Sequence, residues 1–150
     1  MLGDKLISLK MPPPLCVASG ASVRQVIETV QRHRVGAVLV CEGKRLVGIM
    51  TERDVLMKIV ARDVNYDEPI DKFMTANPRT LTSNDTLGKA ISLMIGNDFR
   101  NIPIIDPATG EAIAVLRARD VIHSLAESFP EHVLNLPPKP HQKMKTAEGA

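Results

Sequence analysis

Hydrophobic residues along this chain follow two different spacings. Between Val35 and Val55, two short apolar runs, Val38–Cys41 and Leu46–Met50, are separated by a polar turn at residues 42–44. Short apolar runs bounded by turn residues are typical of buried strands. Beyond them the apolar positions take helical spacing, at Val55, Leu56, Ile59 and Val60. We therefore predict strand, turn, strand and helix, with a bulge or a close backbone approach at Gly48.

A further helix is predicted ahead of this unit. Ser22 is a plausible N-cap, and the apolar residues after it recur at i, i+3, i+4 and i+7, namely Val23, Val26, Ile27 and Val30. We expect this helix to end near Arg34. Prolines at residues 12–14 favour an extended segment that leads into residues 15–17.

The same order of elements recurs after a polar linker at residues 62–69. Thr80 and Leu81 form a short extended piece. Asn84 or Asp85 is expected to cap the next helix, whose apolar stripe is Leu87, Ala90, Ile91, Met94 and Ile95. The recurrence predicts an internal repeat.

The second half of the repeat completes the pattern. Strands are predicted at Ile102–Ile105 and Ala112–Leu116, and Pro103 in the first of them suits a strand start or a sheet edge. A last helix is expected to run to about Phe129. Both copies end in Arg-Asp-Val, at residues 53–55 and 119–121.

These elements predict an α/β fold of two β-α-β-β-α copies, at residues 11–65 and 70–129, followed by a flexible tail at 130–150. A copy of this size would have difficulty burying a sheet face alone. We therefore expect the copies to pack about a pseudo-twofold axis, with equivalent edges around one shared cleft.

Composition excludes several function classes. Aromatic residues make up 3% of the chain and the net charge is +2, which disfavours a nucleic-acid partner. Cys16 and Cys41 lack metal-ligand spacing and are expected to be buried free thiols. The four histidines show no pairing typical of a metal site. No apolar stretch is long enough to span a membrane and no signal peptide is evident, so we expect a cytoplasmic protein without metal.

The residues Thr51-Glu52-Arg53-Asp54 lie where a strand ends and a helix begins. Free backbone N–H groups at such a junction favour an anionic ligand. Thr followed three residues later by an acid also resembles a capping box, which would serve the helix alone. The two interpretations are compatible.

The repeated order of elements resembles a tandem pair of CBS domains, the modules named after cystathionine β-synthase. The first copy carries VGAVLV at 35–40 and LVGIMTERDV at 46–55. The second carries RNIPII at 100–105 and RDV at 119–121, preceded by Met74-Thr75. The resemblance covers residues 11–129.

Membership of this family implies a regulatory module without catalytic activity, which binds an adenosine-containing ligand such as AMP, ADP, ATP, NAD or S-adenosylmethionine in the cleft. It further implies a homodimer, a role as an energy sensor, and a regulated partner protein of unknown identity. The family pattern places ribose at Thr51 and Asp54, with the base near Cys16, Val17, Ala37 and Val38. In the second copy it places ribose at Asp120, with a pocket lined by Thr80, Leu81, Asn101, Ile102 and Pro103.

The second copy departs from the family pattern at Arg117, which stands where a hydroxyl residue belongs. The second site is therefore either altered or given over to phosphate, which Arg100, Arg117, Arg119 and Arg53 would bind with forked contacts. If the site is degenerate, the alternative function is a constitutive dimerising scaffold. No nucleophile–base pair or Walker-type loop is present to suggest an enzyme.

Overall fold

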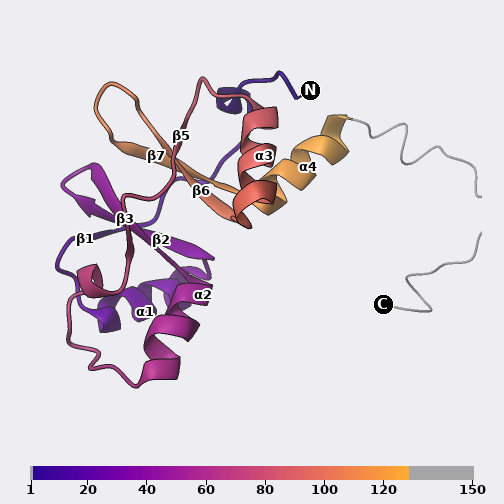
Figure 1. The fold of residues 1–150 in the computed structure, drawn as a ribbon. Helices are drawn as coiled ribbons and strands as arrows, with labels where there is room; N and C mark the ends of the chain where they lie inside the picture. Colours follow the sequence, from indigo (N-terminus) through magenta and orange to yellow (C-terminus); the bar gives the residue numbers. More distant parts are fainter. Residues whose placement is uncertain (1, 129–150) are drawn as a thin grey trace, which may run out of the picture.

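The computed structural model describes residues 2–128, which form two lobes, one from each copy of the repeat (Figure 1). The first lobe holds a four-stranded sheet in the order β1-β2-β3-β4, and the second a three-stranded sheet in the order β5-β6-β7. The predicted α/β fold of two β-α-β-β-α copies is confirmed.

The first lobe follows the predicted order. Its elements are β1 (Cys16–Ala18), α1 (Val23–His33), β2 (Ala37–Glu42), β3 (Arg45–Thr51), α2 (Glu52–Asp54) and β4 (Thr75–Ala76). The chain leaves α2 through a π-helical turn, Val55–Ile59, and a 3-10 turn, Val60–Arg62. Ser22 caps α1 as predicted, in a capping box with Gln25.

The second lobe repeats this order with β5 (Leu81–Thr82), α3 (Leu87–Asn97), β6 (Asn101–Ile105), β7 (Ala112–Arg117) and α4 (Ala118–Ser128). In each lobe a short strand pairs in parallel with the central strand, which pairs antiparallel with the next strand of the chain. The predicted tail at 130–150 lies outside the described residues.

The two sheets meet through alternate residues of their strands. Leu39 and Ile49 of the first sheet form a buried cluster with Val115 of the second. Their neighbours Val40 and Met50 point to the other face, where they pack against α1 in the core of the first lobe. Because strand side chains alternate between faces, one sheet can serve both the core of its lobe and the contact between lobes.

The two hairpin turns also touch each other. Arg45 and Glu111 form an isolated antiparallel bridge. The Leu46 N–H donates to the Gly110 carbonyl, and the Ala112 N–H donates to the Lys44 carbonyl, both at 3.3 Å. This reciprocal pairing is what a pseudo-twofold axis between the copies requires.

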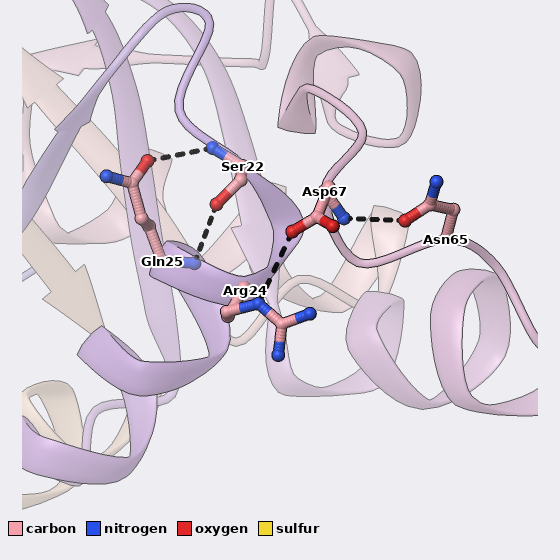
Figure 2. Close-up of polar contacts among 5 residues, drawn as sticks. All are labelled: Ser22, Arg24, Gln25, Asn65 and Asp67. Carbon is pink, nitrogen blue, oxygen red and sulfur yellow. Dashed lines mark hydrogen bonds and ion pairs between the residues drawn. The ribbon is translucent and has the colours of Figure 1, made fainter.

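Each lobe is completed by a chain segment from outside its own β-α-β-β-α unit. In the first lobe the linker returns to the start of α1, where the Val23 N–H donates to the Glu68 carbonyl at 2.9 Å and Ile70 is fully buried. Figure 2 shows this junction, with Asp67 of the linker facing Arg24 beside the Ser22 capping box.

The N-terminal segment does the same for the second lobe. The Leu87 N–H donates to the Asp4 carbonyl, and the Leu6 N–H donates to the Asp85 carbonyl, both at 2.9 Å. Leu6, in a 3-10 turn at Leu6–Ser8, is fully buried in the core that holds Leu81 and Leu116. The beginning of the chain is therefore part of the second lobe.

Two sequence predictions about the second lobe are wrong. Thr86, rather than Asn84 or Asp85, is the N-cap of α3, because its side chain accepts from the Lys89 N–H. Asp85 instead accepts from the Thr82 N–H at 2.7 Å and from Lys89 at 3.0 Å, so it holds the turn before the helix.

Pro103 also lies elsewhere than expected, in the central strand of its sheet and buried. In the first lobe β1 begins its pairing at Cys16 with Leu39, and the Leu39 N–H donates to Leu15. In the second lobe pairing with β5 begins only at Ile104. Proline has no N–H to give at this position, so the shorter β5 accommodates it.

Of the two alternatives predicted at Gly48, a bulge or a close backbone approach, the structure shows the bulge: the β2–β3 register shifts between Val40, the partner of Gly48, and Cys41. The Met74 side chain lies against Gly48, so a Cβ atom at this position would clash with the Met74 sulfur. The cysteine prediction is half right, because Cys41 is buried whereas Cys16 is exposed. Burial and the neighbouring Cys16 thiol raise the pKa of Cys41 to about 12, which keeps it a neutral thiol.

Candidate functional site

The first candidate site is the turn between β3 and α2. The Asp54 N–H donates to Thr51 Oγ1, and the Thr51 N–H donates to Asp54 Oδ2, both at 3.1 Å. This is the reciprocal capping box that the spacing predicts. It fixes the carboxylate at the junction and leaves its second oxygen, Oδ1, for other partners.

Lys58 faces that second oxygen from one turn further along. Its ammonium lies 3.6 Å from Asp54 Oδ1 and donates to the Phe73 carbonyl at 3.0 Å. The distance to Asp54 is that of an ion pair rather than a hydrogen bond. The Asp54 side chain is 21% exposed, so the carboxylate remains accessible from the surface.

The neighbouring strands bring the other first-copy candidates to this end of the sheet. Ala37 pairs with Thr51, and the Glu52 N–H donates to the Gly36 carbonyl at 3.0 Å. Cys16 and Val17 lie on β1, on the opposite side of β2 from Thr51. The Val38 side chain is fully buried, so only its backbone could face a ligand.

The second candidate site has the same backbone with different chemistry. The Arg117 N–H donates to Asp120 Oδ2 at 2.9 Å, in the place of the Thr51 N–H. The Arg117 guanidinium then forks across the carboxylate, with Nε 2.9 Å from Oδ2 and Nη2 2.6 Å from Oδ1. These bonds raise the pKa of Arg117. The Asp120 side chain is 7% exposed, against 21% for Asp54.

The strand residues of the second copy are arranged like those of the first. Asn101 pairs with Arg117, and the Ala118 N–H donates to the Arg100 carbonyl at 2.9 Å. Thr80 precedes β5. The remaining strand candidates have buried side chains, so they could offer a ligand chiefly their backbone: Leu81, Ile102 and Pro103.

Two contacts bring the candidate regions of the two copies together. The Asn101 amide lies beside Gly36, where an added Cβ would be 3.6 Å from its oxygen. Arg53 Nη1 lies 3.7 Å from Asp98 Oδ2 at the end of α3, with both side chains highly exposed. Arg53 therefore pairs with an acid of the second copy. Arg100 and Arg119 are exposed.

Two hollows lie beside these regions. One of about 360 Å³ lies between β1 and α1, lined by Val17, Ala18, Ala21, Gln25, Glu28, Thr29 and Arg32. The other, of about 230 Å³, is bounded by residues 8–10, Asp120 and the α4 side chains His123, Ser124 and Glu127. Neither of these two hollows is lined by Thr51 or Asp54.

Other kinds of site find no support among residues 2–128. No cluster of three or more His, Cys, Asp or Glu side chains in this range could hold a metal ion. No helix in the same range is long and apolar enough to cross a membrane. His33 and His123 are exposed, and the other two histidines lie beyond the described residues.

Sequence reasoning missed three residues that shape the sites: Gly36, Lys58 and Asp98. Lys58 could have been found, because it follows Asp54 at i+4, a spacing that brings opposite charges together on a helix. Asp98 and Gly36 each contact a residue of the other copy, Arg53 and Asn101 respectively. Their neighbouring sequence does not indicate these contacts.

Comparisons with known proteins agree with the two-copy fold. A family model described as the CBS domain matches residues 7–61 and 70–127. An uncharacterized 17.7 kDa protein of Acidianus ambivalens is 29% identical, covering 74% of this chain and 66% of the relative. A CBS domain-containing protein of Arabidopsis thaliana is 31% identical, covering 76% of this chain and 21% of the relative. The chain thus spans less than two thirds of these curated relatives.

Solved structures share the fold. A CBS domain protein of Pyrobaculum aerophilum, complexed with AMP, has a TM-score of 0.73 at 26% identity and covers 83% of this chain and 99% of its own. A CBS domain pair in complex with 5-methylthioadenosine and S-adenosyl-L-methionine has a TM-score of 0.74, covering 83% of this chain and 98% of its own. Its identity is 17%, so that likeness shows the fold alone.

Proposed function

Because this chain belongs to the CBS domain family, with two copies of the domain, we propose that it is a non-catalytic regulatory module for an adenosine-containing ligand. The observation that carries the proposal is the Thr51–Asp54 turn. It holds a partly exposed carboxylate at the junction of β3 and α2, with one oxygen used by the capping box and the other outside hydrogen-bond range of Lys58.

The chemistry of this turn suits a ribose. A carboxylate can accept hydrogen bonds from both hydroxyls of a cis-diol, and bonds to a charged acceptor are the stronger kind. The structural neighbour complexed with AMP, which is 26% identical to this chain, supports an adenosine-containing ligand here. AMP, ADP, ATP, NAD and S-adenosylmethionine are the candidates, and the Lys58 ammonium, 3.6 Å from Asp54 Oδ1, favours those that carry phosphate.

Signalling would follow from contacts between the copies. The Arg53–Asp98 pair and the Gly36–Asn101 contact join the first site to the second lobe. A ligand changes the arrangement of the lobes only if it binds one arrangement better than another. We propose that a ligand bound at Asp54 changes the arrangement of the lobes by competing with Asp98 for Arg53. A partner protein in the cytoplasm would bind one arrangement in preference to the other.

A homodimer is part of the proposal. Large apolar side chains are exposed on helical surfaces of both lobes, at Leu56, Met57, Val60, Ile95 and Ile122. Exposed apolar residues gathered on helices are typical of subunit contacts. Light scattering coupled to size exclusion tests this, since a chain of 16.4 kDa should elute at twice that mass.

The decisive experiment is thermal unfolding with and without each candidate nucleotide at millimolar concentration. A ligand that binds only the folded state at a hundred times its Kd adds about 2.7 kcal/mol. That shifts the Tm by several degrees in a domain pair of this size. A shift with one or two nucleotides supports the sensor and identifies its ligand.

The variant that tests the site is Asp54→Ala. It should abolish the shift, while the free energy of unfolding of the ligand-free protein falls by only about 1 kcal/mol, because one of the two capping-box bonds is lost. Glu52→Ala is the matched control, because Glu52 is an exposed acid of the same turn. If Asp54→Ala binds nucleotide as the natural chain does, the carboxylate serves only the capping box.

The second candidate function is a constitutive dimerising scaffold. The observation that favours it is the Arg117–Asp120 fork, because it occupies one of the two carboxylates that a ligand would use. A dimer that shows no Tm shift with any nucleotide would support this function instead of the sensor.

A further inference from the structure

We propose that Arg117 is a built-in substitute for a ligand in the second lobe, so that the protein takes one adenosine-containing ligand per chain, at Asp54. The inference rests on the proposed function, since it asks which of two equivalent carboxylates can accept the ribose. It concerns Arg117, which precedes α4 at the position that Thr51 occupies before α2.

The contacts of Asp120 carry the argument. Its two oxygens accept three hydrogen bonds from Arg117: one from the backbone N–H and two from the guanidinium, at 2.9, 2.9 and 2.6 Å. The forked geometry is the strong, specific form of an arginine–carboxylate pair. The Arg117 side chain is itself 36% exposed while Asp120 is 7% exposed. The guanidinium therefore covers the carboxylate.

The first lobe shows what the same position looks like without the substitution. Thr51 satisfies the helix start with a backbone N–H and a hydroxyl, and both bonds stay within the capping box. Lys58 approaches Asp54 only to 3.6 Å, as an ion pair, and donates a hydrogen bond to the Phe73 carbonyl at 3.0 Å. A ribose diol would meet one loosely held oxygen here, whereas it would meet a closed fork at Asp120.

Opening the fork is costly for an incoming diol. The diol would replace bonds from a cation with bonds from neutral hydroxyls, which are weaker to the same carboxylate. It would also leave a partly buried guanidinium without its counter-ion. The 230 Å³ hollow reaches Asp120 from the side of α4 and residues 8–10. That access does not release the oxygens, because both are held by Arg117.

The test is equilibrium binding of AMP by calorimetry, with the number of sites per chain as the readout. The variants are Arg117→Thr, which restores the hydroxyl residue of the first copy, and Asp54→Ala, alone and combined. Arg62→Thr is the matched control, because it also replaces an arginine with threonine, at an exposed position that belongs to neither candidate site. Circular dichroism checks that each variant is folded.

We expect one AMP per chain in the natural protein and in Arg62→Thr, and at least a tenfold weaker affinity in Asp54→Ala. Arg117→Thr should bind two AMP per chain, and the added site should survive in Arg117→Thr/Asp54→Ala and disappear when Asp120→Ala is added. Two sites in the natural chain, or no added site in Arg117→Thr, would overturn the inference and leave the proposed function standing.

The remaining outcomes separate the two proposals. AMP binding by Arg117→Thr together with none by the natural chain would support the fork as a substitute ligand while refuting the Asp54 site. No AMP binding by any folded variant at millimolar concentration would refute both. If Arg117 instead binds the phosphate of AMP, one site should persist in Asp54→Ala and disappear in Arg117→Thr. That result would also overturn the inference.

Discussion

The carboxylates that open the second helix of each lobe occupy the same backbone position and meet different cations. Asp54 accepts from the Thr51 N–H and faces Lys58 at 3.6 Å from one turn later. Asp120 accepts from the Arg117 N–H and is forked by the Arg117 side chain at 2.9 and 2.6 Å. The backbone bond that starts the helix is common to both lobes. Accessibility of the carboxylate is set by one side chain three residues before it.

The closing segments of the two lobes make a second such pair. Leu6 fills the core of the second lobe and Ile70 that of the first, and both are fully buried. Leu6 comes from the N-terminal segment, and Ile70 comes directly after the linker at residues 62–69. The two lobes are therefore completed in the same way, although the completing segments lie outside the repeated β-α-β-β-α units of the sequence.

The largest effect is expected from removing these core side chains. Leu6→Ala and Ile70→Ala should each lower the free energy of unfolding by about 2–5 kcal/mol, from lost burial and the cavity left behind. Ile7→Ala is the control, because Ile7 is 68% exposed in the same turn. Chemical denaturation measures all three. A Leu6→Ala change no larger than that of Ile7→Ala would mean that the N-terminal segment does not stabilise the second lobe.

The next effect separates the two carboxylates by stability. Asp120→Asn should cost about 2 kcal/mol, because it weakens charge-assisted bonds to a buried acceptor. Asp54→Asn should cost less than about 1 kcal/mol, because its ion pair with Lys58 is long and partly exposed. Thermal unfolding without ligand compares them. Equal losses would show that the fork adds nothing to the capping bond.

The comparison can also be inverted by moving the arginine. Thr51→Arg should install the fork in the first lobe and weaken AMP binding at Asp54 by about tenfold or more, equivalent to about 1.4 kcal/mol. Thr51→Ser, which keeps the hydroxyl, is the control. Calorimetric titration with AMP measures both variants. Undiminished binding by Thr51→Arg would show that an arginine at this position does not close a site.

The smallest effect concerns pH. The Thr82 N–H and then Lys89 lower the pKa of Asp85, and Ser19 and the Gly20 N–H lower the pKa of Asp71. A lowered carboxylate pKa contributes stability above the unfolded value, near 4, and that contribution is lost as the pH falls through the folded value. Asp85→Asn and Asp71→Asn should each cost about 1 kcal/mol or less at pH 7.

That cost should vanish under acid conditions. Unfolding free energies measured from pH 7 down to pH 2–3 should converge for the natural chain and each variant, because the natural carboxylates are then protonated. A difference that stays constant over this range would mean that the side-chain shape, rather than the charge, holds the turns before α1 and α3.

Local features of the fold could be predicted from the sequence where local physics decides them. The helical spacing of Val23, Val26 and Val30 and the Ser22 cap predicted α1, and the bulge at Gly48 was one of the two alternatives predicted there. The cap of α3 was assigned wrongly because Asp85 and Thr86 are both good capping residues. Asp85 accepts from the Thr82 N–H and Thr86 caps the helix. The spacing of apolar residues does not indicate this division of roles.

Features that depend on distant partners could not be predicted in this way. Pro103 suits a sheet edge by its chemistry, but the shortened β5 makes the central strand possible. The pairing of β4 with β3 and the burial of Leu6 among residues of the second copy have no local signal. At the site, the Thr51–Asp54 box followed from spacing. Whether Arg117 is free to bind a phosphate or is paired with Asp120 could be decided only from the side-chain geometry.

The placement of Leu6 has a consequence for the order in which the protein can assemble. The ribosome makes Leu6 before any of its core neighbours, which extend from Leu81 to Val121. The first lobe carries its own closing residue, Ile70, and can be completed while the rest of the chain is still being made. The N-terminal segment must wait, so Leu6 is made before its core partners and is among the last of the described residues to reach its native contacts. A substitution in the segment around Leu6 would therefore act on the second lobe, late in folding.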